Sequence, residues 1–239
     1  MKITIGHFYP DLLNLYGDRG NILAIKKRCE WRGIETEVKE FSIDDEVDFS
    51  GLDIVFLGGG SDREQLIVCK RLKEIQKDIL DYVQDNGVIL AVCGGYQLLG
   101  HYYQLEKEKI EGLSVLDIYT IAGQKRLIDN VILETDFGSV TGFENHGGRT
   151  YIGAHKPLGK VLYGNGNNGE DEQEGVLYRN VFGTYLHGPI LPKNPNLTDE
   201  LIARALTRKY GTAALSPLDD CIEIQAKEYI IERFLKEKS

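Results

Sequence analysis

Two short apolar runs on either side of a helical pattern constrain the fold of this chain more than any other feature. The run Leu52–Leu57 stops at a glycine triplet, and the run Val88–Val92 stops directly at Cys93. Between them, over residues 62–84, apolar side chains recur at helical spacing, which predicts a helix between two buried strands. Strands joined in this way run parallel, because a parallel pair needs a long crossover connection.

The same alternation begins at the N-terminus. Residues 2–8 and 35–41 read as strands, and residues 18–31 read as a helix that follows Asp18 as its cap. Alternating strands and helices of this kind predict an α/β fold with a doubly wound, mostly parallel sheet.

The second half of the chain changes character. Short β-like runs extend over residues 112–185 and include the polar tract 164–169, which we expect to be a flexible turn. Residues 198–209 and 218–236 read as helices. No linker divides the chain, so we expect a single domain over residues 1–239.

The composition excludes several classes of protein. With 239 residues, of which 42% are hydrophobic and 27% charged, the chain can bury a core and is neither disordered nor fibrous. A net charge of −9 and the lack of a basic face argue against binding to nucleic acid or anionic membranes. The four cysteines lie far apart without metal-ligand spacing, and no leader or long apolar run is evident. We therefore expect a soluble cytoplasmic protein without a metal site.

Cys93 is the sharpest chemical signal. A buried strand ends at this cysteine, Gly94 and Gly95 follow it, and an apolar helix begins after them. This order is the cysteine counterpart of a nucleophile elbow, a strained turn between strand and helix that exposes the reactive side chain. The N-terminus of the helix would favour the thiolate over the thiol. The alternative is a core cysteine beside a tight turn, but strand, glycines and helix together favour a nucleophile.

A thiolate that attacks a carbonyl carbon needs donors for the developing oxyanion. Gly94 offers the N–H of the residue after the nucleophile. We expect a second donor from Gly58–Gly60, because this triplet ends the neighbouring strand and parallel strands bring their carboxyl ends to one edge. The alternatives are a turn that binds nothing and a phosphate cradle, and the missing P-loop lysine disfavours the cradle.

Five histidines compete for the role of general base. His187 ends a predicted strand and precedes Gly188–Pro189, so it can face the same edge of the sheet as Cys93. One of the others ends the first predicted strand, one lies in a polar loop that could touch substrate, and two lie in surface or turn segments. On these grounds alone, the general base is either His187 or one of the other four histidines, and the choice stays open. The other four are His7, His146, His101 and His155.

Several segments together resemble a known family. Gly58–Ser61, Cys93–Gln97 and Tyr185–Gly188 are similar in order and spacing to the motifs of the class I, or triad, glutamine amidotransferases, and within them to the cobyric-acid-synthase-like branch. Asp11–Asn21 resembles the matching segment of free-standing subunits that serve an ATP-dependent, Mur-ligase-like partner. The resemblance extends over nearly the whole chain. It implies a three-layer αβα, flavodoxin-like fold.

The resemblance also implies roles for the matching residues. Cys93 would attack the side-chain amide of glutamine to form a thioester, and His187 would move the protons. The guanidinium of Arg126 would suit the α-carboxylate of glutamine, unless Arg126 and Lys125 are only a solvated basic pair. The implied backbone donors of the oxyanion hole are Gly59, Gly60 and Gly94. Gln97 would be a second side chain that binds glutamine, and the alternative is that it is an ordinary polar helix residue.

One departure from the family pattern concerns the third member of the triad. Many triad enzymes have a glutamate two residues after the histidine, and this chain has Pro189 there. Either a distant carboxylate orients the imidazole or a Cys93–His187 dyad suffices. Asp18 is one candidate for this carboxylate, but the sequence alone does not show whether Asp18 lies near His187.

The activity implied by the resemblance is glutamine hydrolysis with delivery of ammonia to the Mur-ligase-like partner in a hetero-complex. The partner would amidate the α-carboxyl of D-glutamate in the peptidoglycan precursor lipid II. This chain shows no nucleotide motif, so we expect no cofactor here, and ATP and Mg²⁺ on the partner. Two alternatives stay open: a different acceptor such as a cobyrinate-like acid, and a catalytically silent interaction module on the same fold.

Overall fold

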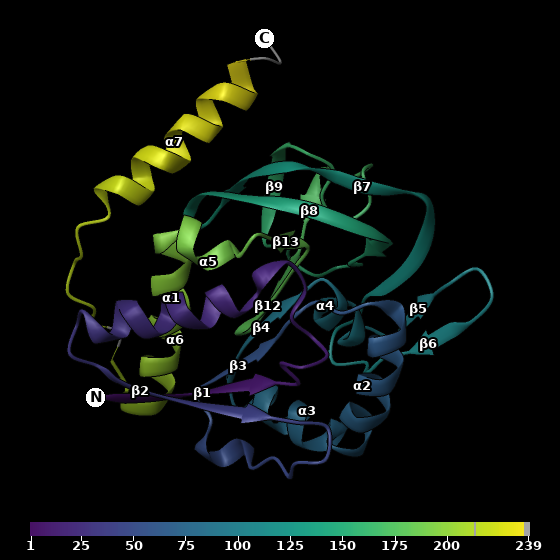
Figure 1. The fold of residues 1–239 in the computed structure, drawn as a ribbon, viewed down its shortest axis with the longest axis horizontal. Coiled ribbons are helices and arrows are strands. Elements are labelled where there is room, and N and C mark those ends of the chain that lie inside the picture. The colour runs from purple at the N-terminus through teal and green to yellow at the C-terminus, as the bar shows by residue number, and fades with distance from the viewer. Residues whose placement is uncertain (213, 237–239) are drawn as a thin grey trace.

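A six-stranded, mostly parallel sheet forms the centre of the molecule (Figure 1). The computed structural model describes residues 1–212 and 214–236, apart from the side chain of Tyr16. The strand order is β11–β12–β4–β3–β1–β2, and all neighbours are parallel except β11 and β12. The strands are β1 (Lys2–Phe8), β2 (Glu35–Phe41), β3 (Ile54–Leu57), β4 (Val88–Val92), β11 (Val176–Tyr178) and β12 (Val181–Thr184). The predicted α/β class with a mostly parallel sheet is confirmed.

The register of the parallel strands brings their carboxyl ends to one edge of the sheet. Leu57, the last residue of β3, pairs with Phe8 of β1 and with Ala91 of β4. Val92, the last residue of β4, pairs with Thr184 of β12. The chain moves outward from β1 in one direction and from β3 in the other, so this edge contains the switch point at which open α/β sheets bind their ligands.

Helices cover both faces of this sheet (Figure 1). On one face α1 (Arg19–Glu30) contacts α6 (Pro195–Tyr210), and on the other α2 (Asp62–Glu74) contacts α3 (Gln76–Gln84). The sequence pattern over residues 62–84 therefore contains two helices rather than one. The break lies at Ile75, whose backbone leaves the helical region with φ −109° and ψ 16°.

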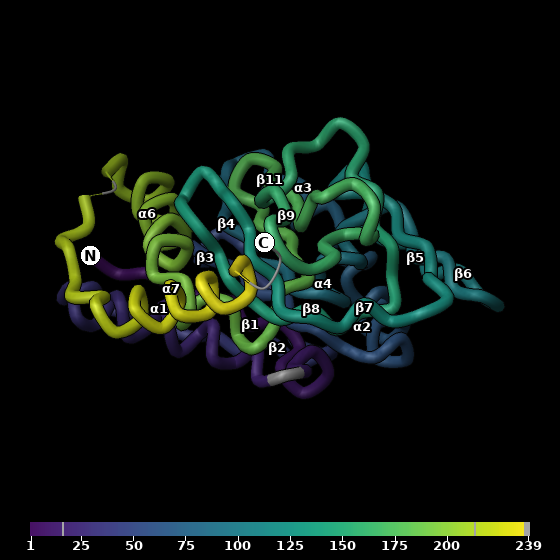
Figure 2. The backbone as a smooth tube through the Cα atoms, turned by 90° about the horizontal axis from the view of Figure 1, so that it is seen from above, coloured from purple at the N-terminus to yellow at the C-terminus, as the bar shows by residue number. Residues whose placement is uncertain are grey.

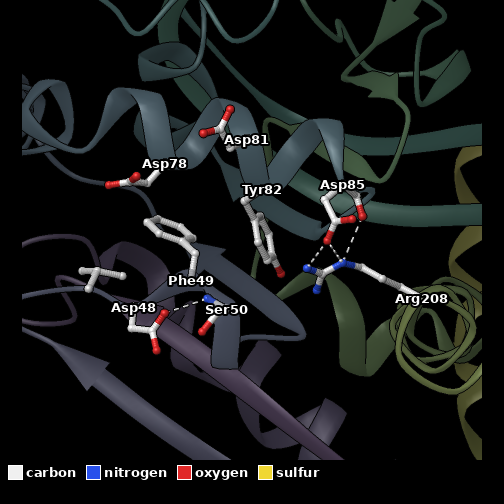
Figure 3. A pocket seen from close by; sticks show the side chains of 9 residues that line it. Asp48, Phe49, Ser50, Asp78, Asp81, Tyr82, Asp85 and Arg208 are labelled. Atoms are coloured by element: carbon white, nitrogen blue, oxygen red, sulfur yellow. Dashed lines mark hydrogen bonds and ion pairs between the residues drawn. The ribbon is translucent and has the colours of Figure 1, made fainter.

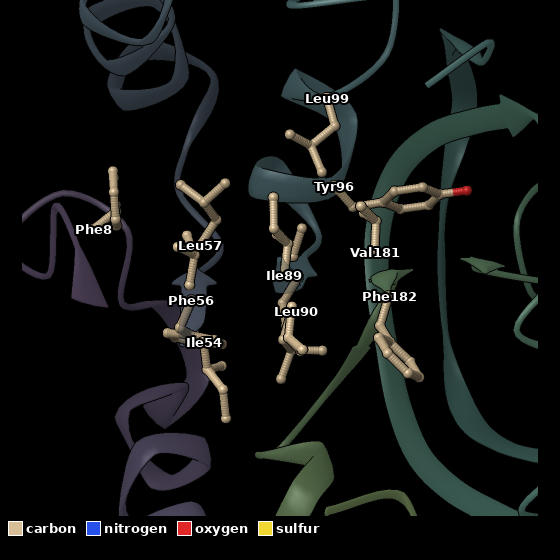
Figure 4. Close-up of a cluster of buried hydrophobic side chains, with 14 of the residues drawn as sticks. Phe8, Ile54, Phe56, Leu57, Ile89, Leu90, Tyr96, Leu99, Val181 and Phe182 are labelled. Carbon is tan, nitrogen blue, oxygen red and sulfur yellow. The ribbon is translucent and has the colours of Figure 1, made fainter. Parts of the chain in front are cut away.

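The core lies between these layers and explains the apolar runs (Figure 4). Every residue of β3 and of β4 is buried, as expected for parallel strands that are covered on both faces. The side chains of Phe56 and Leu90, with Phe182 of β12, are fully or almost fully buried there.

A second, largely antiparallel sheet occupies the region in which only short β-like runs were expected. Its two long strands are β7 (Tyr119–Thr135) and β8 (Gly138–Tyr151), paired along most of their length. Glycines inside β8 weaken its strand pattern in the sequence. The shorter strands are β5 (Tyr102–Gln104), β6 (Lys109–Glu111), β9 (Gly159–Tyr163), β10 (Gln173–Glu174) and β13 (Leu186–His187).

The polar tract 164–169 is not the flexible turn that we expected. Asn167 and Asn168 are buried. Asn167 Nδ2 donates to the carbonyl of Gly175 at 3.0 Å, and the N–H of Gly175 donates to Asn167 Oδ1 at 2.9 Å. The asparagines satisfy buried backbone groups between the two sheets, so the tract is a structural loop.

The C-terminal region contains the short helix α5 (Ile190–Lys193) and α7 (Cys221–Lys236). None of the residues of α7 is buried, and the helix runs along the outside of the molecule (Figures 1 and 2). Arg28 of α1 connects its start to the body, with Nη2 donating to Asp199 at 2.7 Å and to Asp220 at 3.0 Å. In the described ranges, no helix combines the length and apolarity that crossing a membrane requires.

Candidate active site

Cys93 lies at a strained turn between β4 and the short helix α4 (Gly94–Leu98). Its backbone has φ 50° and ψ −105°, a conformation that costs a non-glycine residue about 1–3 kcal/mol. The N–H of Cys93 donates to the carbonyl of Thr184 at 2.8 Å, and the Cys93 carbonyl accepts from the N–H of Gln97 at 2.9 Å. These bonds hold the elbow that the sequence predicted, and the Cys93 side chain is 8% exposed.

The glycines beside Cys93 are required by close packing. A Cβ atom on Gly95 would lie 2.7 Å from the carbonyl oxygen of Leu57, so only glycine lets α4 begin this close to β3. A Cβ atom on Gly59 would lie 3.0 Å from His187 Cε1 and 3.4 Å from Cys93 Cβ. The ends of β3, β4 and β13 therefore meet around one small space.

His187 is the histidine that the fold brings to Cys93. It is fully buried on β13, and its Nδ1 lies 3.3 Å from Asp18 Oδ1. A carboxylate only accepts, so His187 donates from Nδ1 to Asp18. The opposite side of the imidazole ring is left to face Cys93. Burial by itself would lower the pKa of His187, but hydrogen bonds with Asp18 and Cys93 raise the pKa to about 9.

Asp18 is the functional group that sequence reasoning did not place. We expected it to cap α1, but its side chain makes no cap hydrogen bond. Its carboxylate is fully buried and accepts from the N–H of Gly59 at 2.9 Å as well as from His187. The acid lies 169 residues before the histidine, so no local spacing could reveal the pair. Pro189 stands two residues after His187, where many triad enzymes have a glutamate, and that missing carboxylate was the one available signal.

The expected oxyanion donors differ in what their N–H groups do. The N–H of Gly59 is occupied by Asp18. Within residues 1–212 and 214–236, no group accepts a hydrogen bond from the N–H of Gly60 or of Gly94. Both residues lie next to Cys93, Gly94 in the chain and Gly60 in the wall of the same cavity. Gly60 and Gly94 are therefore the free donors at this site.

A cavity of about 650 Å³ opens beside Cys93. Gln97 of α4 and Arg126 of β7 both line it. Arg126 lies in the part of β7 between Ala122 and Leu127 where the pairing with β8 is irregular. Bulges of this kind re-aim side chains. Asn145 holds the guanidinium through its Oδ1, 2.8 Å from Arg126 Nε, and its carbonyl, 2.7 Å from Nη2, which leaves Nη1 for a further acceptor.

The amide of Gln97 is anchored rather than free. Gln97 is buried, and its Nε2 donates to the hydroxyl of Tyr185 at 3.0 Å. The imidazole of His146 stacks on the ring of Tyr185 with centroids 3.6 Å apart, and His146 also lines the cavity. The wall of the cavity is thus a connected set of polar side chains.

The remaining histidines lie outside this constellation. His7 is buried in β1 against Phe56, with ring centroids 5.4 Å apart. His101 contacts Ser114 and Asp117, and His155 Nε2 accepts from the N–H of Asp117 at 2.9 Å.

A second hollow, of about 480 Å³, lies at the opposite edge of the sheet (Figure 3). Phe49 and Asp85 line it just before β3 and β4 begin, and its cation Arg208 is paired with Asp85 at 2.6 Å. Ligands of open α/β sheets bind at the carboxyl edge instead. The cavity beside Cys93 is therefore the candidate active site.

Comparisons with known proteins agree with this geometry. The model of the CobB/CobQ-like glutamine amidotransferase domain matches residues 4–195. The GatD subunit of the glutamine-hydrolyzing lipid II isoglutaminyl synthase from Staphylococcus aureus (strain N315) is 45% identical over 239 residues, covering 99% of this chain and 98% of that protein. Its namesake from Streptococcus pneumoniae is 46% identical, with 95% and 90% covered. A crystal structure of a glutamine amidotransferase, 20% identical, shares the fold with a TM-score of 0.58 over 84% of this chain and 98% of that one.

Proposed function

The chain belongs to the CobB/CobQ-like glutamine amidotransferase family, and we propose that it is the glutamine-hydrolysing subunit of a lipid II isoglutaminyl synthase. The observation that carries the hydrolysis is the contact of a buried imidazole, itself held by a carboxylate, with a cysteine at a strained turn beside a cavity. The acceptor is proposed from the near full-length similarity to the two GatD subunits. Acyl transfer through a thioester needs this arrangement of nucleophile, base and orienting acid.

In the first half of the reaction, the Cys93 sulfur attacks the side-chain amide carbon of glutamine while His187 holds the proton that the two groups share. The carbonyl oxygen becomes an oxyanion that the N–H groups of Gly60 and Gly94 stabilise. When the tetrahedral intermediate collapses, the C–N bond breaks and His187 gives its proton to the leaving nitrogen, which departs as ammonia. Asp18 keeps the imidazole oriented and balances its positive charge.

In the second half, water attacks the thioester while His187 takes one of its protons. The second tetrahedral intermediate again places its oxyanion on Gly60 and Gly94. Its collapse breaks the C–S bond, releases glutamate and returns the proton to the Cys93–His187 pair.

Glutamine would be held by the two cavity side chains. The free Nη1 edge of Arg126 suits the α-carboxylate, because a guanidinium binds a carboxylate through directed hydrogen bonds. Gln97, fixed by Tyr185, would form a polar wall next to the nucleophile.

The ammonia would pass to a partner of the Mur-ligase type that binds ATP and Mg²⁺ and activates the α-carboxyl of D-glutamate in lipid II. Attack by ammonia on the activated carboxyl carbon would break its bond to the activating phosphate, release the phosphate and yield D-isoglutamine. The glycine triplet supports the assignment of ATP binding to the partner. It lacks the lysine of a P-loop, and it packs against Cys93 instead of forming a phosphate site. We place the reaction in the cytoplasm, in line with the free state of the four cysteines.

The decisive test combines the two half-activities. Glutamine hydrolysis should disappear in Cys93→Ala and persist in Cys221→Ala, a control at an exposed cysteine remote from the site. Together with the ligase subunit, the wild-type chain should amidate lipid II in a reaction that requires glutamine and ATP. Undiminished hydrolysis in Cys93→Ala would overturn the proposed chemistry. Amidation of a cobyrinate-like acid in place of lipid II would leave the hydrolysis intact and overturn the acceptor.

A further inference from the structure

Several hydrogen bonds hold the glycine segment after β3, and the N–H of Gly60 takes part in none of them among the described residues. The carbonyl of Gly58 accepts from the N–H of Gly95 at 3.1 Å, and the carbonyl of Gly59 accepts from the N–H of Leu15 at 3.1 Å. A trans peptide points its N–H away from its carbonyl, so the N–H of Gly60 points away from Leu15. The hydrogen bond from Leu15 to the Gly59 carbonyl therefore fixes the direction of the Gly60 N–H, which is one of the two free donors.

Gln65 of α2 completes this arrangement. Its Nε2 donates to the carbonyl of Gly60 at 3.3 Å, next to the N–H of Ser61, which donates to Glu64 Oε2 at 2.7 Å. The same amide group lies against Gly94, where a Cβ atom would come within 3.0 Å of Gln65 Cδ and 3.1 Å of Nε2. One side chain thus contacts both residues whose N–H groups are free at the site.

The burial of Gln65 is not explained by stability. The residue is 3% exposed, and among the described residues its Oε1 has no hydrogen-bond partner. A buried acceptor without a partner lowers the stability of the fold, whereas an apolar side chain of similar volume would pack there without that cost. A polar group retained at such a cost beside a reactive cysteine points to a role in the chemistry.

We propose that Gln65 is a positioning residue for the oxyanion hole. Its hydrogen bond to the Gly60 carbonyl and its contact with Gly94 keep the two N–H donors converged on one point before glutamine binds. Donors that are already oriented stabilise the developing charge without reorganisation at the moment of reaction. This inference rests on the proposed glutamine hydrolysis, and it assigns to Gln65 no contact with the substrate.

The test is Gln65→Met, which keeps the volume of the side chain and removes its donor. We expect kcat for glutamine hydrolysis to fall about tenfold, less than the loss of a whole oxyanion donor because both N–H groups remain. KM should change less than twofold. The matched control is Gln76→Met on α3, where Gln76 Nε2 donates to the carbonyl of Leu113 at 2.6 Å, the same type of bond away from the cavity. That control should keep the wild-type kcat.

A second measurement separates positioning from a general loosening of the site. Alkylation of Cys93 by iodoacetamide passes through no oxyanion, so its rate and pH profile should be the same in Gln65→Met and in the wild type. An unchanged kcat, a loss equalled by Gln76→Met, or a shifted alkylation profile would each overturn the inference.

If Gln65→Met does not fold, Gln65→Leu serves in its place, because its apolar side chain also cannot donate to the Gly60 carbonyl. It should show the same split between kcat and KM, and a wild-type kcat would count against the role. A wild-type chain that fails to hydrolyse glutamine, alone and with the ligase subunit, would instead overturn the proposed function. The two failures are therefore distinguishable.

Discussion

At the scale of single residues, Asp18 has the most demanding position in the molecule. One of its oxygens accepts from His187 and the other from the N–H of Gly59, so its two bonds serve the general base and the glycine segment at once. An asparagine there could accept only one of these bonds and would present an N–H₂ group to the other donor. Both oxygens of this residue are thus used in hydrogen bonds.

We expect Asp18→Asn to lower kcat/KM for glutamine by up to about 10⁴-fold, the loss seen when the orienting acid of a triad is replaced by its amide. The amide would stabilise the wrong tautomer of His187 or release Gly59. Steady-state hydrolysis assays measure the effect, with Asp11→Asn, an exposed change in the same loop, as the control. Activity within tenfold of the wild type would mean that the Cys93–His187 pair needs no third member.

At the scale of elements, the bend from β12 into β13 sets the position of His187. Glu174 of β10 holds this bend, because its carboxyl accepts from the N–H of Tyr185 at 2.7 Å and from the hydroxyl of Thr184 at 3.1 Å. Burial raises the pKa of Glu174 to about 8, although these hydrogen bonds favour the charged form. The acid is therefore neutral in the folded protein at pH values at which it is ionised in the unfolded chain.

This difference predicts a dependence of stability on pH. The contribution of Glu174 is complete below its ordinary pKa of 4.5 and is lost as the pH rises toward about 8, with a slope of up to ~1.4 kcal/mol per pH unit. His187, raised from 6.5 to about 9, acts in the same sense at higher pH. Urea unfolding of Glu174→Gln should therefore show a smaller decline between pH 5 and 8 than the wild type.

Glu172→Gln is the control for that experiment, since Glu172 is an exposed neighbour on the same loop. It should follow the wild-type decline. Parallel curves for Glu174→Gln and the wild type would show that Glu174 titrates in the same range in both states.

The elements that the sequence predicted well are those with a strong period and clear ends. The strands around Leu52–Leu57 and Val88–Val92, and the helix after Asp18, follow from local patterns of burial. The long pair β7–β8 was underestimated because interior glycines interrupt its alternation. The tract 164–169 was misjudged because its asparagines read as solvated turn residues, although they satisfy buried backbone groups of the second sheet.

At the scale of the whole molecule, the site is assembled from five distant parts of the chain, which contain Asp18, Gly60, Cys93, Arg126 and His187. Local context pointed to Cys93 and the glycines, because a nucleophile elbow is a contiguous pattern. Asp18 contacts Gly59 and His187 across the fold, and no single segment encodes these contacts. Gln65 bonds to Gly60 within its own segment but reaches Gly94 only through the fold. The roles proposed for Arg126 and the other site residues stay predictions until variants are measured.

The outer helix α7 has contacts to the body but no buried residue. We expect a chain that ends at Asp220, which keeps the pairing of Arg28, to hydrolyse glutamine at a rate within about twofold of the wild type and to lose only a few degrees of Tm. Activity assays and thermal unfolding measure both. A loss of hydrolysis would show that α7 supports the active site.

The origin of the orienting acid has a consequence for how the protein is made. In a growing polypeptide the Asp18 loop, the glycine triplet and the elbow all leave the ribosome before His187, which comes last among the groups of the site. An incomplete translation product, released early, would contain the sulfur without its proton acceptor. A fragment that ends before His187 should therefore hydrolyse no glutamine, although it contains the nucleophile.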